Sequence, residues 1–422
     1  MNICHVSFSD QKGGAARAAF RIHASLQGGS AIHVTSSMRV SRKQGDEPSI
    51  HGPNGKKAAL PLARSALGDL LPALQRTSNP VLHSLSWLPC SLDRELNASD
   101  ADLLHLHWVQ GEMLSIEAIG RLRKPVVWTL HDCWAFSGSE HYPNDPDDLR
   151  YQQGYHRHNR PPGHGGLDLD RWCWQRKRRH WRRPIQLVSP SRWLAGCVQR
   201  SALLAHWPLR VIPYPLPTNV YQPWPQALAR KLFGLPEEGP LLLFGAIGGS
   251  RDPRKGWDLL EAALRQLAPT LPALQAVVFG QAEPLDPPRL GLPVHYVGAL
   301  HDDQTLALLY SAADVMVVPS RMDNLPQTAI EAQSCGVPVV AFNATGLPDV
   351  VEHQRSGYLA TPYDPADLAH GIGWVLEDSE RRAALGLQAR QRAERLWNPG
   401  RIAGLYAELY EEVLNSAPSR TR

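Results

Sequence analysis

Two acidic side chains, spaced eight residues apart, form the strongest chemical signal in the sequence. Asp323 follows an apolar run at 315–319, and Glu331 lies in the predicted helix beyond it, ahead of a Gly-Val-Pro turn at 336–338. Ligands of open parallel sheets bind where strands end, so Asp323 stands where a sugar could lie. Glu331 can reach a ribose diol with two acceptor oxygens, and the helix N-terminus beside them favours a phosphate. The alternative to a binding site is that Asp323 lies in an ordinary acidic turn and Glu331 on a solvated helix face. That alternative does not explain the surrounding strand–loop–helix pattern.

The segment 319–340 resembles the Glu-x7-Glu signature of the retaining glycosyltransferase family 4, which has the GT-B fold. The resemblance implies that Asp323 contacts a donor sugar, that Glu331 binds the ribose of its nucleotide, and that Asn324 and Leu325 belong to the same donor site. The chain differs from the signature in two places. Asp323 is one methylene shorter than the usual Glu, and Asn324-Leu325-Pro326 replaces Gly-Phe-Gly, which puts a residue without an N–H into the loop. These differences leave the identity of the donor sugar open.

A basic loop near the middle of the chain matches a second feature of this family. There, an Arg and a Lys bind the donor pyrophosphate, and Lys255-Gly256 matches the family's Lys-Gly pair. Fixed cations at this place stabilise the negative charge that grows on a leaving pyrophosphate. The family's Arg lies five residues before the Lys, where this chain has Ser250, so we expect Arg251, in preference to Arg254, to replace it. A solvated basic turn is the alternative.

Two features of the N-terminal half complete the predicted site. Gly13 and Gly14 lie in the first predicted βα loop, where residues without side chains let the backbone approach a phosphate or an acceptor. His131 follows the predicted strand at 125–130, and the resemblance implies that it faces the donor sugar. His105 and His107 share one face of the preceding strand, and we expect them to be hydrogen-bonded core residues.

The elements that must position these residues alternate between strand and helix along the whole chain. This rhythm predicts an α/β protein with parallel sheets covered on both faces. A proline-rich stretch at 212–217 marks a crossover between two halves, because proline breaks both helices and strand ladders. We therefore predict a GT-B fold in which the parallel sheets of two Rossmann-like domains face each other across a cleft. The predicted parts are 1–212 on the acceptor side, 213–396 for the nucleotide sugar, and a helix and tail at 397–422 that pack back towards the first domain.

The predicted elements can be stated by residue range. Strands are expected at 1–8, 103–108, 125–130, 186–190, 241–245, 276–279, 294–297, 315–319, 338–342 and 358–360. Helices are expected at 15–27, 191–200, 257–267, 304–313, 327–335, 365–377, 379–396 and 401–415. Residues 142–166 are rich in Pro, Asp, His and Gly and are predicted to form a long irregular loop.

Composition excludes several other classes of protein. A net charge of only +4 over 422 residues argues against wholesale nucleic-acid binding. The six cysteines include no pair with CxxC spacing, so neither a zinc site nor a thioredoxin-type motif is predicted, and we expect no metal and no cofactor. The chain shows no signal-peptide pattern and no apolar run long enough to span a membrane, which predicts a cytoplasmic protein.

One segment, from Arg171 to Arg183, combines seven basic residues with three tryptophans and contains no acid. Tryptophan settles at membrane interfaces and basic residues attract anionic lipid, so this segment could dock the protein on the inner face of the cell membrane. The alternative is a solvated helix whose tryptophans pack into the domain.

Taken together, the sequence predicts a metal-independent, retaining hexosyltransferase that uses a nucleotide-sugar donor and a glycan or lipid-linked acceptor. The motifs at 105–108 and 129–134 resemble a branch of the family used in bacterial exopolysaccharide assembly, of the colanic-acid type. Two other functions stay open. One is a nucleotide-sugar epimerase or hydrolase with the same fold, and the other is a non-catalytic subunit that binds a nucleotide sugar.

Overall fold

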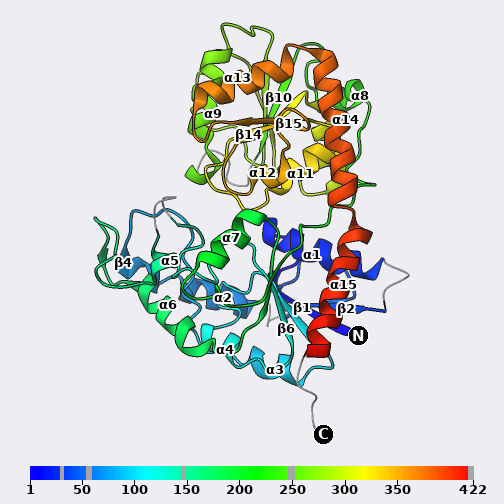
Figure 1. The fold of residues 1–422 in the computed structure, drawn as a ribbon. Helices are drawn as coiled ribbons and strands as arrows, with labels where there is room; N and C mark the ends of the chain where they lie inside the picture. The colour runs from blue at the N-terminus through cyan, green and yellow to red at the C-terminus, as the bar shows by residue number, and fades with distance from the viewer. Residues whose placement is uncertain (29–32, 54–58, 144–148, 246–251, 417–422) are drawn as a thin grey trace. The chain divides into compact units, whose positions relative to one another are not determined.

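The computed structural model describes residues 1–28, 33–53, 59–143, 149–245 and 252–416. The chain divides into two compact units. Unit 1 contains Met1–Tyr214 together with Gly400–Arg422, and unit 2 contains Pro215–Pro399. Each unit is built around a parallel sheet, and Figure 1 shows each sheet lying between helices. The predicted fold class of two α/β domains with parallel sheets is confirmed.

The main sheet of unit 1 has seven strands in the order β3-β2-β1-β5-β6-β8-β9, all parallel. A separate antiparallel pair joins β4 to β7. The strands are β1 (Asn2–Ser9), β2 (Thr35–Arg42), β3 (Ile50–His51), β4 (Gln75–Arg76), β5 (Leu103–Leu106), β6 (Val126–Thr129), β7 (Gly165–Gly166), β8 (Gln186–Ser189) and β9 (Leu209–Val211). The helices are α1 (Gly14–Gln27), α2 (Ala59–Gly68), α3 (Leu92–Ala98), α4 (Ile116–Gly120), α5 (Arg150–Gln153), α6 (Leu169–His180), α7 (Arg192–Arg200) and α15 (Pro399–Ser416).

The sheet of unit 2 has six parallel strands in the order β12-β11-β10-β13-β14-β15. The strands are β10 (Leu241–Gly245), β11 (Gln275–Phe279), β12 (Val294–Gly298), β13 (Val315–Val318), β14 (Val339–Phe342) and β15 (Gly357–Ala360). The helices are α8 (Gln226–Leu232), α9 (Trp257–Leu267), α10 (Asp303–Ala312), α11 (Gln327–Ser334), α12 (Leu347–Val350), α13 (Pro365–Leu376) and α14 (Ser379–Leu396).

Buried apolar runs and polar caps explain why these segments fold as they do. Strands β5, β6, β10, β13 and β14 are buried along their whole length, as expected of parallel strands covered on both faces. Helices α7, α10, α13 and α14 each begin after a Ser or Asp whose side chain accepts a hydrogen bond from a backbone N–H of the first turn.

The core of unit 1 is completed by the last helix of the chain. Ile402, Tyr406 and Tyr410 of α15 are fully buried and pack with Ile3 of β1 and Val127 of β6. Residues at the two ends of the chain therefore belong to one core. The region 142–166, predicted to be irregular, contains the one-turn helix α5 and strand β7.

Candidate active site

Lys255 and Asp323 form an ion pair in unit 2. Lys255 ends a short turn (Pro253–Lys255) between β10 and α9, and Asp323 follows β13, the strand beside β10. Lys255 Nζ donates a hydrogen bond to Asp323 Oδ2 at 2.5 Å, and Ser320 Oγ donates to the same oxygen at 3.4 Å. The strand order reverses between β10 and β13, which is where open α/β sheets bind ligands. The pair therefore stands at the place in this sheet where a ligand is expected.

Two glycines bring the loops of this pair into close backbone contact. Gly256 has a φ of 67°, and a Cβ there would lie 1.9 Å from the carbonyl oxygen of Pro319, the residue that follows β13. A Cβ on Gly346 would lie 1.4 Å from the carbonyl oxygen of Asn324, and the Gly346 N–H donates to the carbonyl of Asp323 at 3.0 Å. Any side chain at either glycine must displace backbone. The position of the ion pair thus depends on these two close approaches.

Arg321, which sequence reasoning missed, joins the same two loops. Its backbone N–H donates to the carbonyl of Arg254 at 2.7 Å. Its guanidinium donates to both carboxylate oxygens of Asp258 in α9, at 2.7 and 2.6 Å. The hydrogen bond from Arg321 is the main reason that the pKa of Asp258 is lowered. The only sequence signal for this residue is its place between Ser320 and Met322 in the predicted donor loop.

Glu331 lies on α11, close behind the Asp323 loop in sequence but buried. Its Oε2 accepts a hydrogen bond from the Tyr310 hydroxyl at 2.8 Å, which orients the carboxylate. Asn324 and Leu325 are also buried. Pro326 occupies the N-cap position of α11 and has no side-chain group that could cap the helix. The start of α11 is therefore shaped by backbone rather than by a polar cap.

The predicted pyrophosphate arginine, Arg251, lies outside the described residues. Its alternative, Arg254, donates to Asp252 Oδ2 at 2.6 Å. That pairing is local, because the two residues are separated by one position in the turn before Lys255.

Gly13 and Gly14 mark the beginning of α1 at the end of β1. Gly13 is the N-cap residue with a φ of 96°, a conformation that side-chain-bearing residues rarely adopt. Among the described residues, leaving aside the chain immediately around Gly13, no atom lies within 4 Å of the position that a Cβ would occupy there. The structure thus leaves the start of α1 accessible in unit 1.

His131 lies two residues beyond β6 in unit 1, and protein groups occupy both of its ring nitrogens. Nδ1 shares a hydrogen bond with the Tyr214 hydroxyl at 2.8 Å, and Nε2 shares one with Nδ1 of His107 at 3.2 Å. Burial lowers the pKa of His131 to about 4, so the ring is neutral at neutral pH. The side chain is thus a fixed, neutral imidazole.

A second pair beside His131 was not predicted from the sequence. Asp132 Oδ2 accepts hydrogen bonds from His141 Nδ1 at 2.6 Å and from the Trp108 indole N–H at 3.2 Å. Burial opposes ionisation of Asp132, but His141 outweighs it, and the pKa of Asp132 is lowered. His141 Nε2 bonds in turn to Ser84 Oγ at 2.8 Å. The His-Asp dipeptide was the only sequence signal for this network.

The basic, tryptophan-rich segment divides into a buried and an exposed part. Trp174 and Trp181 are buried, whereas Trp172 is partly exposed and stacks against Arg176. Lys177 is fully buried, and its ammonium group donates to the carbonyls of Trp134, Ser137 and Gly138. Two of the three tryptophans and Lys177 therefore belong to the core, which agrees with the alternative that the tryptophans pack into the domain.

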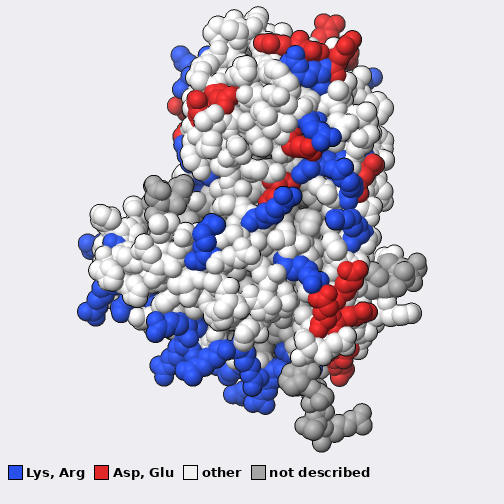
Figure 2. All heavy atoms as spheres, in the orientation of Figure 1, with Lys and Arg blue, Asp and Glu red and all other residues white. Residues whose placement is uncertain are grey.

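The rest of that segment contributes to a positively charged surface. Figure 2 shows Lys and Arg side chains gathered on the part of unit 1 where Figure 1 places α4 and α6. Arg176 pairs there with Glu117, at 2.7 Å between Nη2 and Oε2. The exposed basic residues of the segment, with two from the turn after α4, are Arg178, Arg179, Arg182, Arg183, Arg121 and Arg123.

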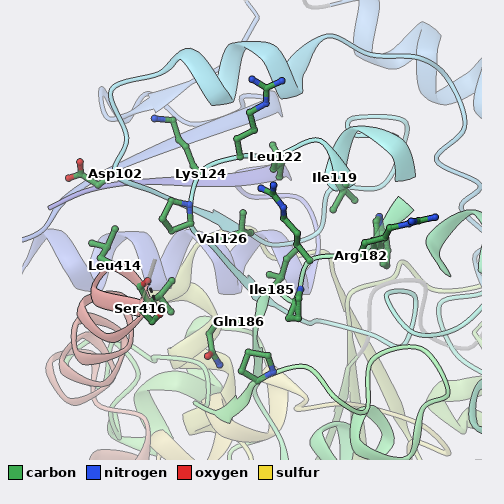
Figure 3. A pocket seen from close by; sticks show the side chains of 18 of the residues that line it. Asp102, Ile119, Leu122, Lys124, Val126, Arg182, Ile185, Gln186, Leu414 and Ser416 are labelled. Atoms are coloured by element: carbon green, nitrogen blue, oxygen red, sulfur yellow. Dashed lines mark hydrogen bonds between the residues drawn. The ribbon is translucent and has the colours of Figure 1, made fainter. Parts of the chain in front are cut away.

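A hollow of about 1000 Å³ lies next to this surface, at the opposite edge of the sheet from His131. Lys124 and Gln186 line it at the beginnings of β6 and β8, and Leu414 lines it from α15 (Figure 3). Because ligands of parallel sheets bind at the carboxyl ends of strands, we do not assign the donor to this hollow.

Three buried histidines in unit 1 lie close enough together to suggest a metal site. Ring nitrogens of His5, His105 and His107 lie within 4.8 Å of one another. Five of their six nitrogens, however, already bond to protein groups. His105 bonds to Tyr410 and Thr129, and His107 bonds to His5 and His131. These nitrogens serve a hydrogen-bonded core rather than a set of metal ligands.

Comparison with known proteins finds a match to a glycosyltransferase family in each unit. Residues 27–220 match the family described as Glycosyltransferase Family 4, and residues 229–392 match the family described as Glycosyl transferases group 1. A sucrose-phosphate synthase structure from Thermosynechococcus elongatus aligns with a TM-score of 0.67 at 20% identity, covering 99% of this chain and 100% of that one. The fold is that of the GT-B glycosyltransferases.

Other similar proteins agree with this assignment of the fold. The Anabaena protein Alr3699/HepE, solved with UDP and glucose, aligns with a TM-score of 0.65 at 18% identity over 97% of this chain and 99% of that one. The D-inositol 3-phosphate glycosyltransferase of Thermobispora bispora is 33% identical over 225 residues, which cover 47% of this chain and 50% of the relative. The chain thus spans about half the length of the curated relatives it matches. Within the described residues, every helix is too short or too polar to cross a bilayer.

Proposed function

We propose that this GT-B protein is a retaining glycosyltransferase that moves a hexose-type sugar from a nucleotide-diphosphate donor to an acceptor. The observation that carries the proposal is the ion pair of Lys255 with Asp323 at the strand-order reversal of unit 2, next to the helix that holds Glu331. A cation for the pyrophosphate and carboxylates for the sugar and ribose are the groups that such a donor needs. The match of residues 229–392 to Glycosyl transferases group 1 supports this assignment.

In the proposed reaction, Lys255 stabilises the departing pyrophosphate. An ammonium group has three hydrogens, so Lys255 can keep its bond to Asp323 while it donates to a phosphate oxygen. Asp323 accepts hydrogen bonds from sugar hydroxyls, and Glu331, held by Tyr310, accepts from the ribose. The bond between the anomeric carbon and the phosphate oxygen breaks, and the nucleoside diphosphate leaves. The acceptor oxygen bonds to the anomeric carbon on the same face, and the released phosphate oxygen takes the acceptor proton. The step as proposed needs no bound metal or cofactor, because Lys255 supplies the positive charge.

Unit 1 would supply the acceptor side. Gly13 leaves room beside the start of α1, after β1, and His131 follows β6 at the same edge of the sheet. We propose a glycan or lipid-linked saccharide in bacterial surface-polysaccharide assembly as the acceptor, on the basis of the motifs at 105–108 and 129–134. A polyol phosphate is the second candidate, since the similar curated proteins are named for D-inositol 3-phosphate.

We further propose that the protein works in the cytoplasm, at the inner face of the cell membrane. The exposed arginines around α4 and α6 favour an anionic membrane surface. Nucleic acid is a poorer partner for this surface, because no nucleic-acid-binding module accompanies it.

Donor binding tests the proposal directly. We expect one nucleotide sugar, among UDP-glucose, UDP-galactose, UDP-N-acetylglucosamine and GDP-mannose, to raise the melting temperature, since a ligand that binds only the folded state stabilises it. Glu331→Gln should weaken the binding of that donor by about 1.5–3 kcal/mol in calorimetry, because it removes a charged acceptor. Glu238→Gln, at an exposed loop position of the same unit, is the matched control.

The products of turnover then distinguish the alternatives. Transfer to a saccharide or polyol phosphate with retained anomeric configuration supports the glycosyltransferase. Free sugar or an epimerised donor without acceptor would indicate the hydrolase or epimerase, and tight binding without turnover would indicate a binding subunit. If none of the nucleotide sugars binds, the assignment of the Lys255–Asp323 site to a donor is wrong.

A further inference from the structure

Three histidines in the core of unit 1 form one continuous hydrogen-bonded row that ends at His131. His5 Nδ1 bonds to His107 Nε2 at 2.9 Å, and His107 Nδ1 bonds to His131 Nε2 at 3.2 Å. His131 Nδ1 then bonds to the Tyr214 hydroxyl at 2.8 Å. At the other end, His5 Nε2 is buried and has no hydrogen-bond partner among the residues that the structure describes. We refer to His5, His107 and His131 as the histidine row.

The row comes from the topology of the sheet. β1 pairs with β5, and β5 pairs with β6. His5 lies within β1, whereas His107 and His131 follow the ends of β5 and β6. The rings of His5 and His107 are stacked, with centroids 5.3 Å apart, and the ring of His131 stacks on Tyr214 at 5.5 Å. Each of the three rings is therefore fixed by packing as well as by hydrogen bonds.

The shared hydrogen bonds link the tautomers of the three rings. A neutral imidazole carries one hydrogen, on either Nδ1 or Nε2. Burial lowers the pKa of all three histidines, so all are neutral at neutral pH. With the hydrogens on Nδ1, His5 donates to His107, His107 donates to His131, and His131 donates to Tyr214. With the hydrogens on Nε2, every bond reverses its direction.

The buried end of the row decides between these two arrangements. In the second arrangement, the N–H at His5 Nε2 would lie in the core without an acceptor, whereas the first leaves only a lone pair there. Buried N–H groups without an acceptor are rarer in proteins than acceptors without a donor. The Tyr214 hydroxyl can accept or donate, so this end of the row permits either direction. The first arrangement, with the hydrogen on Nδ1 of each ring, is therefore favoured.

We propose that His5 and His107 are positioning residues that hold His131 in its Nδ1–H tautomer, with its ring fixed between His107 and Tyr214. Both ring nitrogens of His131 are then committed, so His131 acts as a fixed neutral side chain and not as a general acid or base. The tautomer itself is a property of the free protein. Only its consequence for turnover rests on the proposed glycosyltransferase function.

Two other buried histidines serve as internal controls. His23 bonds to Ser36 Oγ at 2.7 Å and to Ser49 Oγ at 2.9 Å, and it has no hydrogen bond to the row. His105 bonds to Tyr410 and Thr129, each at 2.7 Å. A change at His23 disturbs the same core without touching the hydrogen bonds of the row.

Nitrogen NMR of protein labelled at histidine tests the proposal without any ligand. We expect the His131 signals, assigned by their loss in His131→Asn, to show a single Nδ1–H tautomer in the wild type. His107→Leu should convert His131 to the other tautomer or to a mixture, whereas His23→Gln should leave it unchanged. His107→Gln keeps an amide donor beside His131 and should preserve the tautomer, and it replaces the Leu variant if that variant does not fold.

The possible results separate clearly. An Nε2–H tautomer of His131 in the wild type, or an unchanged tautomer in a folded His107→Leu variant, would overturn the proposal. With a donor found by the melting screen, His107→Leu should lower kcat by about tenfold or more with little change in the KM for that donor, and His107→Gln should restore part of the loss. If no donor binds, the proposed function fails while the NMR result still decides the role of the row.

Discussion

Acidification should destabilise unit 1 over a narrow pH range because of its buried histidines. Burial lowers the pKa of His23 and His131 to about 4, and it lowers the pKa values of His5, His105 and His107 well below their usual range. The unfolded chain titrates near the ordinary value of about 6.5. Between that value and about pH 4, the unfolded state binds more protons than the folded state, so stability falls as the pH falls.

The size of this effect follows from proton linkage. Well below pH 6.5, each such histidine removes about 1.4 kcal/mol of stability per pH unit. Glu140 acts in the opposite direction, because burial raises its pKa and the folded state keeps its proton. Between pH 7 and 5.5, His23 and His131, whose pKa values are lowered to about 4, together remove about 2.5 kcal/mol of stability, and His5, His105 and His107 act in the same direction. A loss of that size is a large fraction of the usual stability of a domain, which is about 5–15 kcal/mol.

Urea unfolding followed by tryptophan fluorescence at several pH values between 7 and 5.5 measures this loss. His23→Gln should reduce the average slope of stability against pH over this range by about 0.8 kcal/mol per pH unit, because the unfolded variant takes up one proton fewer as it passes the ordinary histidine pKa of about 6.5. His206→Gln, at an exposed position of the same unit, should leave the slope unchanged. A flat stability over this range, or a slope that His23→Gln does not alter, would refute the reasoning.

Three further predictions concern the site and the surface. Lys255→Ala should lower kcat more than it raises the KM for the donor, because the charge of the lysine matters most as the nucleoside diphosphate departs. Steady-state kinetics measure both constants. A change in KM alone would assign Lys255 to ground-state binding. Gly346→Ala should displace the backbone that carries Asp323 and abolish donor binding in calorimetry, since its Cβ would lie 1.4 Å from the Asn324 carbonyl oxygen, and unchanged binding would show that the contact is not needed. Wild-type protein should co-sediment with anionic vesicles at low salt and be released at high salt. This binding should be lost when glutamine replaces four exposed arginines of unit 1: Arg178, Arg179, Arg182 and Arg183. It should persist in a control variant with glutamine at four exposed basic positions of unit 2: Lys231, Arg265, Arg289 and Arg395. Wild-type protein that stays in the supernatant at low salt would contradict membrane docking.

The sequence predicted the elements of unit 2 better than those of unit 1. The bounds of β10, α9 and α14 agree with the prediction to the residue, because each is a clear apolar pattern that ends at Gly, Pro or a polar cap. β2 was missed, although it pairs with β1 along nearly its whole length. Its sequence, Thr-Ser-Ser-Met-Arg-Val-Ser-Arg, is too polar to show the pattern of a strand buried on both faces.

Candidate site residues could be selected from the sequence where the signal is their spacing along the chain. Contacts that depend on the order of the strands in the sheet could not be predicted. Asp323 and Glu331 were selected from their spacing together with the strand, loop, helix and Gly-Val-Pro turn around them. The bond between His5 and His107 requires that β1 and β5 are neighbours, which sequence spacing does not reveal. Lys177 shows the same limit, because the carbonyls that hold it come from a loop some forty residues earlier.

The shared core of the two chain ends sets the order in which this protein can fold during synthesis. Unit 1 lacks α15, and with it Tyr406 and Tyr410, until residues 399–416 have been made. At about 5–20 residues per second, residues 215–399 alone take roughly 10–40 s to synthesise. Unit 2 is contiguous and can fold as soon as it emerges, whereas the N-terminal segment must wait with part of its apolar core uncovered. The core of unit 1 is therefore completed only after all of unit 2 has been synthesised.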